Sequence, residues 1–164
     1  MTAEAPPIMD LGLSAAEPAA NMLPVMESEG PALEHLSRDE CIRLMGSVLV
    51  GRIVYTLQAL PAVELVNFAL DDGDIIIRTD SGGKLAAATR GAVVAFEADS
   101  VDAHGHAGWS VTVVGQSGAV TDGAEIRHLE HTGIMPWAPG GHDHFIRIAP
   151  AIINGRRFAP GRPA

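Results

Sequence analysis

The sequence has little cysteine, little aromatic character and few basic residues. Its single cysteine, Cys41, excludes an intramolecular disulfide and a metal site made of cysteines alone. There are 11 basic residues against 20 acidic ones, and the resulting net charge of −9 repels nucleic acid and acidic membrane surfaces. No apolar run reaches the length of a membrane span, and the N-terminus lacks the basic start and apolar block of a signal peptide. We therefore expect a cytoplasmic protein that binds neither nucleic acid nor a membrane.

The composition suffices for one globular domain, because the 164 residues are 47% hydrophobic. Residues 1–34 are rich in Ala, Pro, Glu and Met and contain no basic residue, so we expect a flexible acidic tail there. An alternative is that Ile8–Leu11 or Asn21–Leu23 docks on a partner subunit as an arm. The folded domain is predicted over residues 35–160, and residues 161–164 form a short C-terminal tail.

Short strands dominate the predicted secondary structure. Ser37 and Glu40 form a capping box that predicts a short helix ending at about Met45, and a second helix is expected to start near Thr121 and run toward Glu130. A further, Ala-rich helical stretch is expected at 85–89. Runs of β-branched and aromatic residues predict strands at 48–56, 61–70, 75–77, 91–97, 109–120, 144–148 and 151–158. Tight turns and the lack of long crossover helices favour a small closed barrel, mainly β and antiparallel, over a parallel sheet.

A possible phosphate-binding turn follows the strand that ends at Arg78 and Thr79. The turn 80–83 contains two glycines and precedes a predicted helix that starts at Lys84. Backbone N–H groups at a helix start attract anions, and glycine lets an anion approach the backbone closely. Arg78 and Lys84 supply countercharge, while Thr79 and Ser81 offer hydroxyl donors. The alternative is an ordinary surface turn followed by a solvated lysine.

Five segments follow one another in a recognisable order: Val50–Tyr55, Pro61–Phe68, Ile76–Leu85, Gly108–Gly115 and Phe145–Arg157. Together they cover the chain from about Leu36 to Phe158. In this order they resemble the pyridoxamine 5'-phosphate oxidase-like FMN-binding split-barrel proteins, a group that includes flavin and deazaflavin oxidoreductases. The resemblance implies a split β-barrel of the Greek-key type and a homodimer. It also implies that flavin mononucleotide (FMN) lies at the two-fold interface with its phosphate on the strand-to-helix turn.

The resemblance also implies eight cofactor-binding residues: Val66, Asn67, Arg78, Thr79, Gly83, Lys84, Trp109 and Ser110. Those in the segment 78–84 match the phosphate side, although Gly83 stands where many relatives place a second basic residue. Those at 66–67 match the approach to the flavin ring, and those at 109–110 reach the cofactor from the neighbouring part of the interface. Alternatively, Trp109 is a core anchor and Asn67 a hydrogen-bonding residue beside a turn.

A flavin brings its own redox chemistry, so no catalytic side chain is predicted. Relatives that oxidise pyridoxamine 5'-phosphate carry an Arg-x-His element near the C-terminus, whereas here the matching stretch is Arg156-Arg157-Phe158, without histidine. We therefore expect an FMN-dependent oxidoreductase that acts on another small molecule, with NADH or NADPH as a possible electron donor. The alternative function is a non-catalytic carrier or sensor of a planar cofactor, which can be FMN, a deazaflavin or haem.

Three histidine pairs are candidate ligands for a metal ion or haem: His104/His106, His128/His131 and His142/His144. Their spacing gives little support for a site, because two of these pairs border glycine-rich loops where solvated histidine is the ordinary outcome. We therefore predict no metal site. Cys41 lies beside apolar Ile42 in the first predicted helix, which favours a buried, unreactive thiol over a nucleophile.

Overall fold

The computed structural model describes residues 33–79, 85, 89–102, 104, 106–134 and 144–159. Most of the predicted N-terminal tail and all of the C-terminal one lie outside the described residues, as do Gly83, Lys84, His142 and most of the helical stretch at 85–89. None of the helices among the described residues is long and apolar enough to cross a membrane.

Within these ranges the chain forms seven strands and two helices. In chain order they are β1 (Leu33–Leu36), α1 (Arg38–Met45), β2 (Val50–Leu57), β3 (Leu60–Asp71), β4 (Asp74–Thr79), β5 (Val93–Asp102), β6 (Ala107–Ala119), α3 (Gly123–Glu130) and β7 (His144–Phe158).

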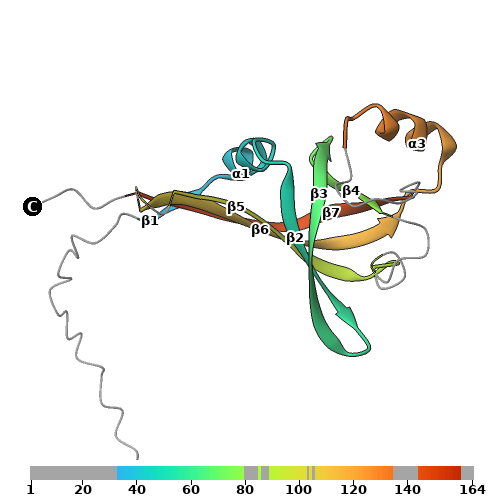
Figure 1. Ribbon diagram of the computed structural model, residues 1–164, viewed down its shortest axis with the longest axis horizontal. Coiled ribbons are helices and arrows are strands. Elements are labelled where there is room, and N and C mark those ends of the chain that lie inside the picture. Colours follow the sequence, from blue (N-terminus) through green and yellow to red (C-terminus); the bar gives the residue numbers. More distant parts are fainter. Residues whose placement is uncertain are drawn as a thin grey trace, which may run out of the picture.

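The strands close into a six-membered antiparallel ring. Their hydrogen-bonded order is β7-β4-β3-β2-β5-β6, and β6 pairs back onto β7 to complete the ring. Strand β1 adds to the far half of β7, opposite the part that pairs with β4. Figure 1 shows this far half as an extended arm of β1, β5, β6 and β7 beneath α1, with α3 beside the ends of β4 and β7. The predicted antiparallel split barrel is thereby confirmed.

Both helices begin where their capping residues predict. The Ser37 Oγ atom accepts a hydrogen bond from the Glu40 amide at 3.4 Å, and the Glu40 carboxylate accepts one from the Ser37 amide at 3.1 Å. At α3 the Asp122 carboxylate accepts hydrogen bonds from the amides of Ala124 and Glu125 at 3.0 and 2.8 Å. Each cap satisfies N–H groups that have no partner within the helix, which is why the helix starts there.

The end of the chain differs from the prediction of two strands, because β7 runs unbroken from His144 to Phe158. Pro150, which lies between the two predicted strands, is opposite Gly115 at the point where the β6–β7 register shifts. A proline is tolerated at such a bulge because its missing N–H is not needed for the ladder there. Gly115 permits the close approach, since a Cβ atom there would lie 2.2 Å from the Ala149 carbonyl oxygen. Strand β1 has no counterpart among the predicted elements.

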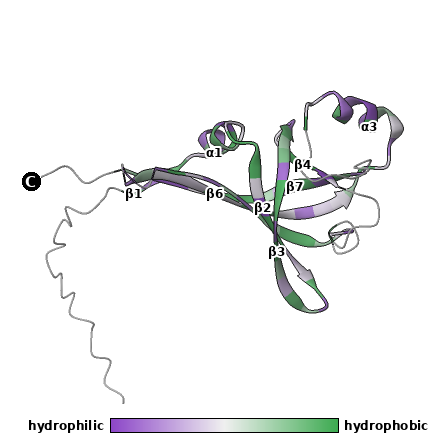
Figure 2. Ribbon diagram, viewed as in Figure 1, coloured by the Kyte–Doolittle hydropathy of each residue, from purple (hydrophilic) through white to green (hydrophobic). Residues whose placement is uncertain are grey.

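Two apolar clusters stabilise the barrel. The main core fills the inside of the ring and continues beneath α1, whose Cys41 and Met45 are fully buried. A smaller second cluster lies on the outer side of β3, β4 and β7, where Ile76, Leu129, Ile134 and Phe145 pack together under α3. Figure 2 shows hydrophobic residues concentrated in the strands that meet at the centre, while α3 is mostly hydrophilic. Helix α3 is therefore anchored through a small part of its surface.

Candidate functional site

Strand geometry sorts the predicted cofactor residues onto two faces of the barrel. Successive side chains of a strand point to opposite faces, and the predictions named adjacent residues on β3, β4 and β6. One member of each adjacent pair therefore faces the inside of the ring and the other faces outward.

The inward members are Val66, Thr79 and Trp109. Val66 packs against the main core, and Trp109 belongs to it with only 9% of its surface exposed. Thr79 shares the face of Ile75 and Ile77 and is 7% exposed. In a single chain these three side chains therefore contribute to packing, which for Trp109 is the alternative that the sequence left open.

The outward members on β3 and β4 are Asn67 and Arg78, and they lie close together. The β3–β4 ladder ends at the pair Phe68 and Ile77, so Asn67 and Arg78 are the next residues on the two strands. The Arg78 guanidinium lies over the Phe145 ring, 5.5 Å from its centroid, which is a cation–π contact. Both side chains thus border the second cluster at the edge of α3. The predicted partners Gly83 and Lys84 lie outside the described residues, so the phosphate-binding turn itself stays a prediction.

Two cavities on this outer face have Leu49 in common in their linings. One, of about 160 Å³, is lined by Leu49, Asn67, Phe68, Ala69, Thr132, Gly133 and Ile134. The other, of about 380 Å³, is lined by Val48, Leu49, Val50, Arg52, Leu65 and Asp99. We call the two cavities together the outer groove. It combines one predicted residue, Asn67, with the apolar side chains of Leu49 and Leu65, which are 70% and 63% exposed.

One wall of the outer groove carries an arginine that binds two carboxylates. Arg52 donates hydrogen bonds to Glu97 at 2.8 Å and to Asp99 at 2.6 Å from the neighbouring strand β5. These two carboxylates raise the pKa of the arginine, mainly through the hydrogen bond to Asp99. Because the Arg52 guanidinium binds both carboxylates, it is held along the wall of the groove.

Ser110, the outward member on β6, lies in a different cavity on the same outer face. Its hydroxyl accepts a hydrogen bond from Arg156 Nε at 3.2 Å. The cavity has a volume of about 250 Å³ and is lined by His35, Ser110, Thr112, Asn154, Gly155 and Arg156. Ser110 pairs with Asp99 across β5 and β6, so this cavity and the outer groove flank the same pair of strands.

Sequence reasoning missed Leu49, Leu65 and Arg52 in the groove and His35 and Arg156 near Ser110. Three of them were detectable in principle, because Arg52, Leu65 and Arg156 are exposed residues whose two neighbours along the strand are less exposed. His35 belongs to β1, whose four residues carry no recognisable strand pattern.

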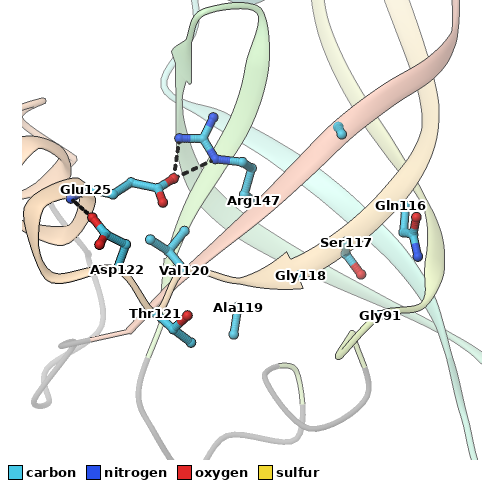
Figure 3. A pocket seen from close by; sticks show the side chains of 11 residues that line it. Gly91, Gln116, Ser117, Gly118, Ala119, Val120, Thr121, Asp122, Glu125 and Arg147 are labelled. Carbon is cyan, nitrogen blue, oxygen red and sulfur yellow. Dashed lines mark hydrogen bonds and ion pairs between the residues drawn. The ribbon is translucent and has the colours of Figure 1, made fainter.

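A larger cavity, of about 480 Å³, lies apart from all predicted cofactor residues. It is lined by Gly91, Gln116–Asp122, Glu125, Arg147 and Ala149. Figure 3 shows Glu125 reaching from α3 to Arg147 on β7 across this cavity. Arg147 also contacts Asp71 at 2.9 Å and Asp74 at 2.8 Å, so three carboxylates surround one guanidinium.

Hydrogen bonds and burial shift the pKa values of Arg147 and Asp71. Burial opposes the charge of Arg147, but hydrogen bonds to Asp74, Asp71 and Glu125 outweigh it and raise the pKa of the guanidinium. The pKa of Asp71 is lowered, first by a hydrogen bond with His128 at 2.9 Å and then by the one with Arg147. Both shifts favour the charged forms of Asp71 and Arg147.

The histidines show no shared site within the described ranges. His128 contacts Asp71, and His131 Nδ1 lies 2.6 Å from the carbonyl oxygen of Arg127. No group of three His, Cys, Asp or Glu residues that could hold a metal ion occurs among the residues that the structure describes. Cys41 is fully buried, and its burial raises the pKa of the thiol, in agreement with an unreactive side chain.

Comparison with known proteins gives consistent matches. Residues 37–157 match the family model described as Pyridoxamine 5'-phosphate oxidase. An uncharacterized protein of Mycobacterium tuberculosis is 39% identical over 128 residues, which cover 75% of this chain and 84% of that protein. Among solved structures, the FAD binding protein from Mycobacterium smegmatis is 34% identical with a TM-score of 0.66, covering 76% of this chain and 98% of that one. A putative pyridoxamine 5'-phosphate oxidase from Corynebacterium glutamicum is 32% identical with a TM-score of 0.69, covering 79% and 96%.

Proposed function

The chain belongs to the pyridoxamine 5'-phosphate oxidase family, and from this premise we propose that it is a flavin-dependent oxidoreductase that binds its flavin in the outer groove. The observation that carries the proposal is that Asn67 lines the outer groove together with the exposed side chain of Leu49, while Arg78 lies beside Asn67 just beyond the end of the β3–β4 ladder. The similarity to an FAD binding protein of Mycobacterium smegmatis supports a flavin as the ligand.

The residues of the outer groove fit a planar ring with a polar edge. Leu49 and Leu65 expose apolar surface, which a ring system covers favourably. Asn67 presents an amide whose oxygen accepts and whose nitrogen donates hydrogen bonds, as the ring's polar edge requires. Arg52 is held by Glu97 and Asp99 and adds a fixed donor to the far wall.

Arg78 is proposed to contact the phosphate, together with Lys84 from the segment beyond Thr79. An arginine can hold two phosphate oxygens through parallel N–H groups, and its cation–π contact with Phe145 restricts its orientation. Thr79 faces the main core, so we propose that it supports the strand rather than donating its hydroxyl to the cofactor.

When bound, a flavin accepts and donates the electrons of the reaction, so the protein needs to bind, orient and shield it. We propose a small-molecule substrate other than pyridoxamine 5'-phosphate, with NADH or NADPH as electron donor. The cavity beside Ser110 and Arg156 offers hydrogen-bonding groups that can orient such a substrate.

The proposed nucleotide is FMN, on the pattern of Arg78 and Lys84. FAD is the second candidate, because the 34% identical relative from Mycobacterium smegmatis is an FAD binding protein. Mass spectrometry of small molecules released from the purified protein distinguishes them directly. Fluorescence titrations of the flavin-free protein with FMN, FAD and riboflavin then rank the affinities and measure how much the phosphate contributes.

A matched pair of variants tests the outer groove. Leu49→Glu places a carboxylate where both cavities meet and is expected to weaken flavin binding by about tenfold or more, or about 1.4 kcal/mol or more. Leu60→Glu, at a residue 68% exposed on the tip of the β2–β3 hairpin, is expected to leave the affinity unchanged. Equal affinities of the two variants would remove the groove from the proposal.

A non-catalytic carrier of a planar cofactor is the alternative function. Anaerobic mixing of the flavin-loaded protein with NADH or NADPH separates the two functions. Bleaching of the flavin absorbance indicates an oxidoreductase, whereas a persistent oxidised spectrum with every donor favours a carrier.

We further propose that a second copy of the chain covers the outer face. Five aliphatic side chains form one continuous row across five strands: Val63, Val54, Ala95, Val114 and Ile152, each paired with the next. Val63 and Ile152 at the two ends of the row are 60% and 53% exposed in the single chain. A contiguous apolar row of this kind is typical of a surface buried by association.

A further inference from the structure

Arg147 on β7 connects the β3–β4 turn with α3, which are distant from each other and from Arg147 in sequence. Its guanidinium contacts Asp71 at the end of β3, Asp74 at the start of β4 and Glu125 on α3, with N···O distances of 2.7 to 2.9 Å. The side chain of Arg147 is only 25% exposed, so water screens these contacts less than it would at an open surface. A planar guanidinium with five donors suits three carboxylates at once, which a single ammonium group does not.

Two contacts hold α3 on the barrel, one with Arg147 and one with Asp71. Glu125 binds Arg147 directly, and His128, one helical turn further on, contacts the other oxygen of Asp71 at 2.9 Å. The apolar anchorage of α3 comes from Leu129, its only fully buried side chain, and from the partly buried Ile126. The charged contacts act together with this packing to set where the helix lies.

The end of α3 continues directly into the outer groove. The hydroxyl and the amide of Thr132 donate to the Leu129 carbonyl oxygen at 2.6 and 3.1 Å, which holds the chain close to the helix end. Thr132, Gly133 and Ile134 then line the cavity that contains Asn67. The position of α3 thus sets one wall of the groove.

The second cluster extends the same influence to Arg78. Leu129 and Ile134 pack with Phe145, which is 1% exposed, and the Phe145 ring lies beneath the Arg78 guanidinium. A shift of α3 therefore changes the surroundings of both proposed flavin-contacting residues, Asn67 and Arg78, although α3 itself supplies neither.

We propose that Arg147 is a positioning residue for the flavin site: through Glu125 and the Asp71–His128 contact it holds α3 as a wall of the outer groove. This inference rests on the proposed function, because it names the element that shapes the same site. Arg147 does not touch the outer groove and acts on it only through the helix.

The test uses the full chain and two measurements. Hydrogen exchange of the flavin-free protein reports on α3 itself, and fluorescence titration with FMN reports on the groove. Arg147→Met is expected to speed exchange in α3 with little change in β6, and to weaken FMN binding about tenfold, within the range of couplings carried by packed networks. Arg147→Lys is expected to recover part of the affinity, because it keeps the charge but loses the three-way fork.

Two further variants control for folding and for loss of any ion pair. Glu125→Gln removes only the α3 side of the cluster and is expected to change both measurements in the same direction by a smaller factor, even if Arg147→Met does not fold. Arg157→Met breaks contacts to Glu34 on β1 and Glu40 on α1 and is expected to leave FMN affinity unchanged.

Unchanged exchange in α3, or faster exchange with unchanged FMN affinity, overturns the inference. A wild-type protein that binds no flavin removes the proposed function and the inference with it. In that case the exchange data still show whether Arg147 holds the helix, so the two failures are distinguishable.

Discussion

The buried phenol of Tyr55 provides a measurable pH dependence of stability. It is 4% exposed and donates a hydrogen bond to the Glu64 carboxylate. Burial first, and then the contact with Glu64, raises the pKa of Tyr55 from 10.0 to about 12. Because the folded state holds this proton more tightly than the unfolded state, the stabilisation is complete below pH 10 and is lost as the pH rises toward 12.

The expected loss is roughly 3 kcal/mol, since one pKa unit corresponds to about 1.4 kcal/mol. Tyr55→Phe is expected to remove this loss of stability between pH 10 and 12. It is also expected to lower the free energy of unfolding by about 1 kcal/mol near neutral pH, through the lost hydrogen bond. Chemical denaturation at several pH values measures both effects. Tyr55 is the only tyrosine, so the phenolate absorbance reports on this residue alone. The prediction is wrong if the free energy of unfolding decreases equally with rising alkaline pH in the wild-type protein and in Tyr55→Phe.

The tip of the β2–β3 hairpin contains two residues in an unfavourable backbone conformation. Gln58 and Ala59 have φ angles of 51° and 64°, in the left-handed region that a two-residue turn between right-twisted strands requires. An alanine there carries a steric penalty that glycine avoids. Ala59→Gly is therefore expected to raise the free energy of unfolding by about 1 kcal/mol, seen as a higher melting temperature.

Ala62→Gly on β3 is the matched control, because it puts the same substitution in regular strand and is expected to lower stability. A lower melting temperature for Ala59→Gly would show that the turn does not keep these angles in solution.

At single residues, the sequence did not predict which of the proposed cofactor residues face the inside of the barrel and which face outward. The pairs 66–67, 78–79 and 109–110 all lie on strands, and alternation turns one side chain of each pair into the barrel. The residue types did not reveal which one, because Thr79 is polar yet buried, whereas Leu65 is apolar yet exposed. Facing depends on which strands pair, which is a property of the closed ring.

Among the elements, the docking of α1 depends on one glycine in β7. A Cβ atom at Gly155 would lie 2.3 Å from Cys41 Sγ and 3.1 Å from Leu36 Cβ. Gly155→Ala is therefore expected to cost about 1 to 3 kcal/mol by overpacking. Chemical denaturation measures the loss. Cys41→Ala removes the closest atom, so the double variant is expected to be more stable than the sum of the single effects predicts.

Gly118→Ala is the control, since a Cβ atom there meets nothing within 4 Å. If the changes in unfolding free energy caused by Gly155→Ala and Cys41→Ala simply add in the double variant, α1 shifts to accommodate the methyl group.

Helix starts were predictable and strand continuity was not. The caps at Ser37 and Asp122 are local signals, complete within four residues, and both helices follow them. Strand β7 was predicted as two strands, 144–148 and 151–158, but it continues through Pro150, which a register shift against Gly115 accommodates. That compensation lies 35 positions away in the sequence (150 − 115) and arises only when β6 and β7 pair.

At the scale of the whole molecule, we proposed that the row from Val63 to Ile152 is buried in a dimer. Measuring the oligomeric state tests this proposal. In a two-fold dimer each residue of the interface occurs twice, so one charge on this face is introduced at two places. Ile152→Lys is expected to shift the protein from dimer to monomer in sedimentation velocity. Because Ile152 is 53% exposed in the single chain, the same change is expected to leave the monomer fold intact.

Leu60→Lys is the control, because Leu60 is 68% exposed but lies outside the row. Loss of flavin binding together with the dimer would support a site shared between subunits, since the outer groove and the Ser110 cavity both open on the face that carries the row. Retained flavin binding in the Ile152→Lys monomer would assign the whole site to one chain. A wild-type protein that sediments as a monomer at micromolar concentration would instead leave the exposed aliphatic row without a partner and refute the dimer.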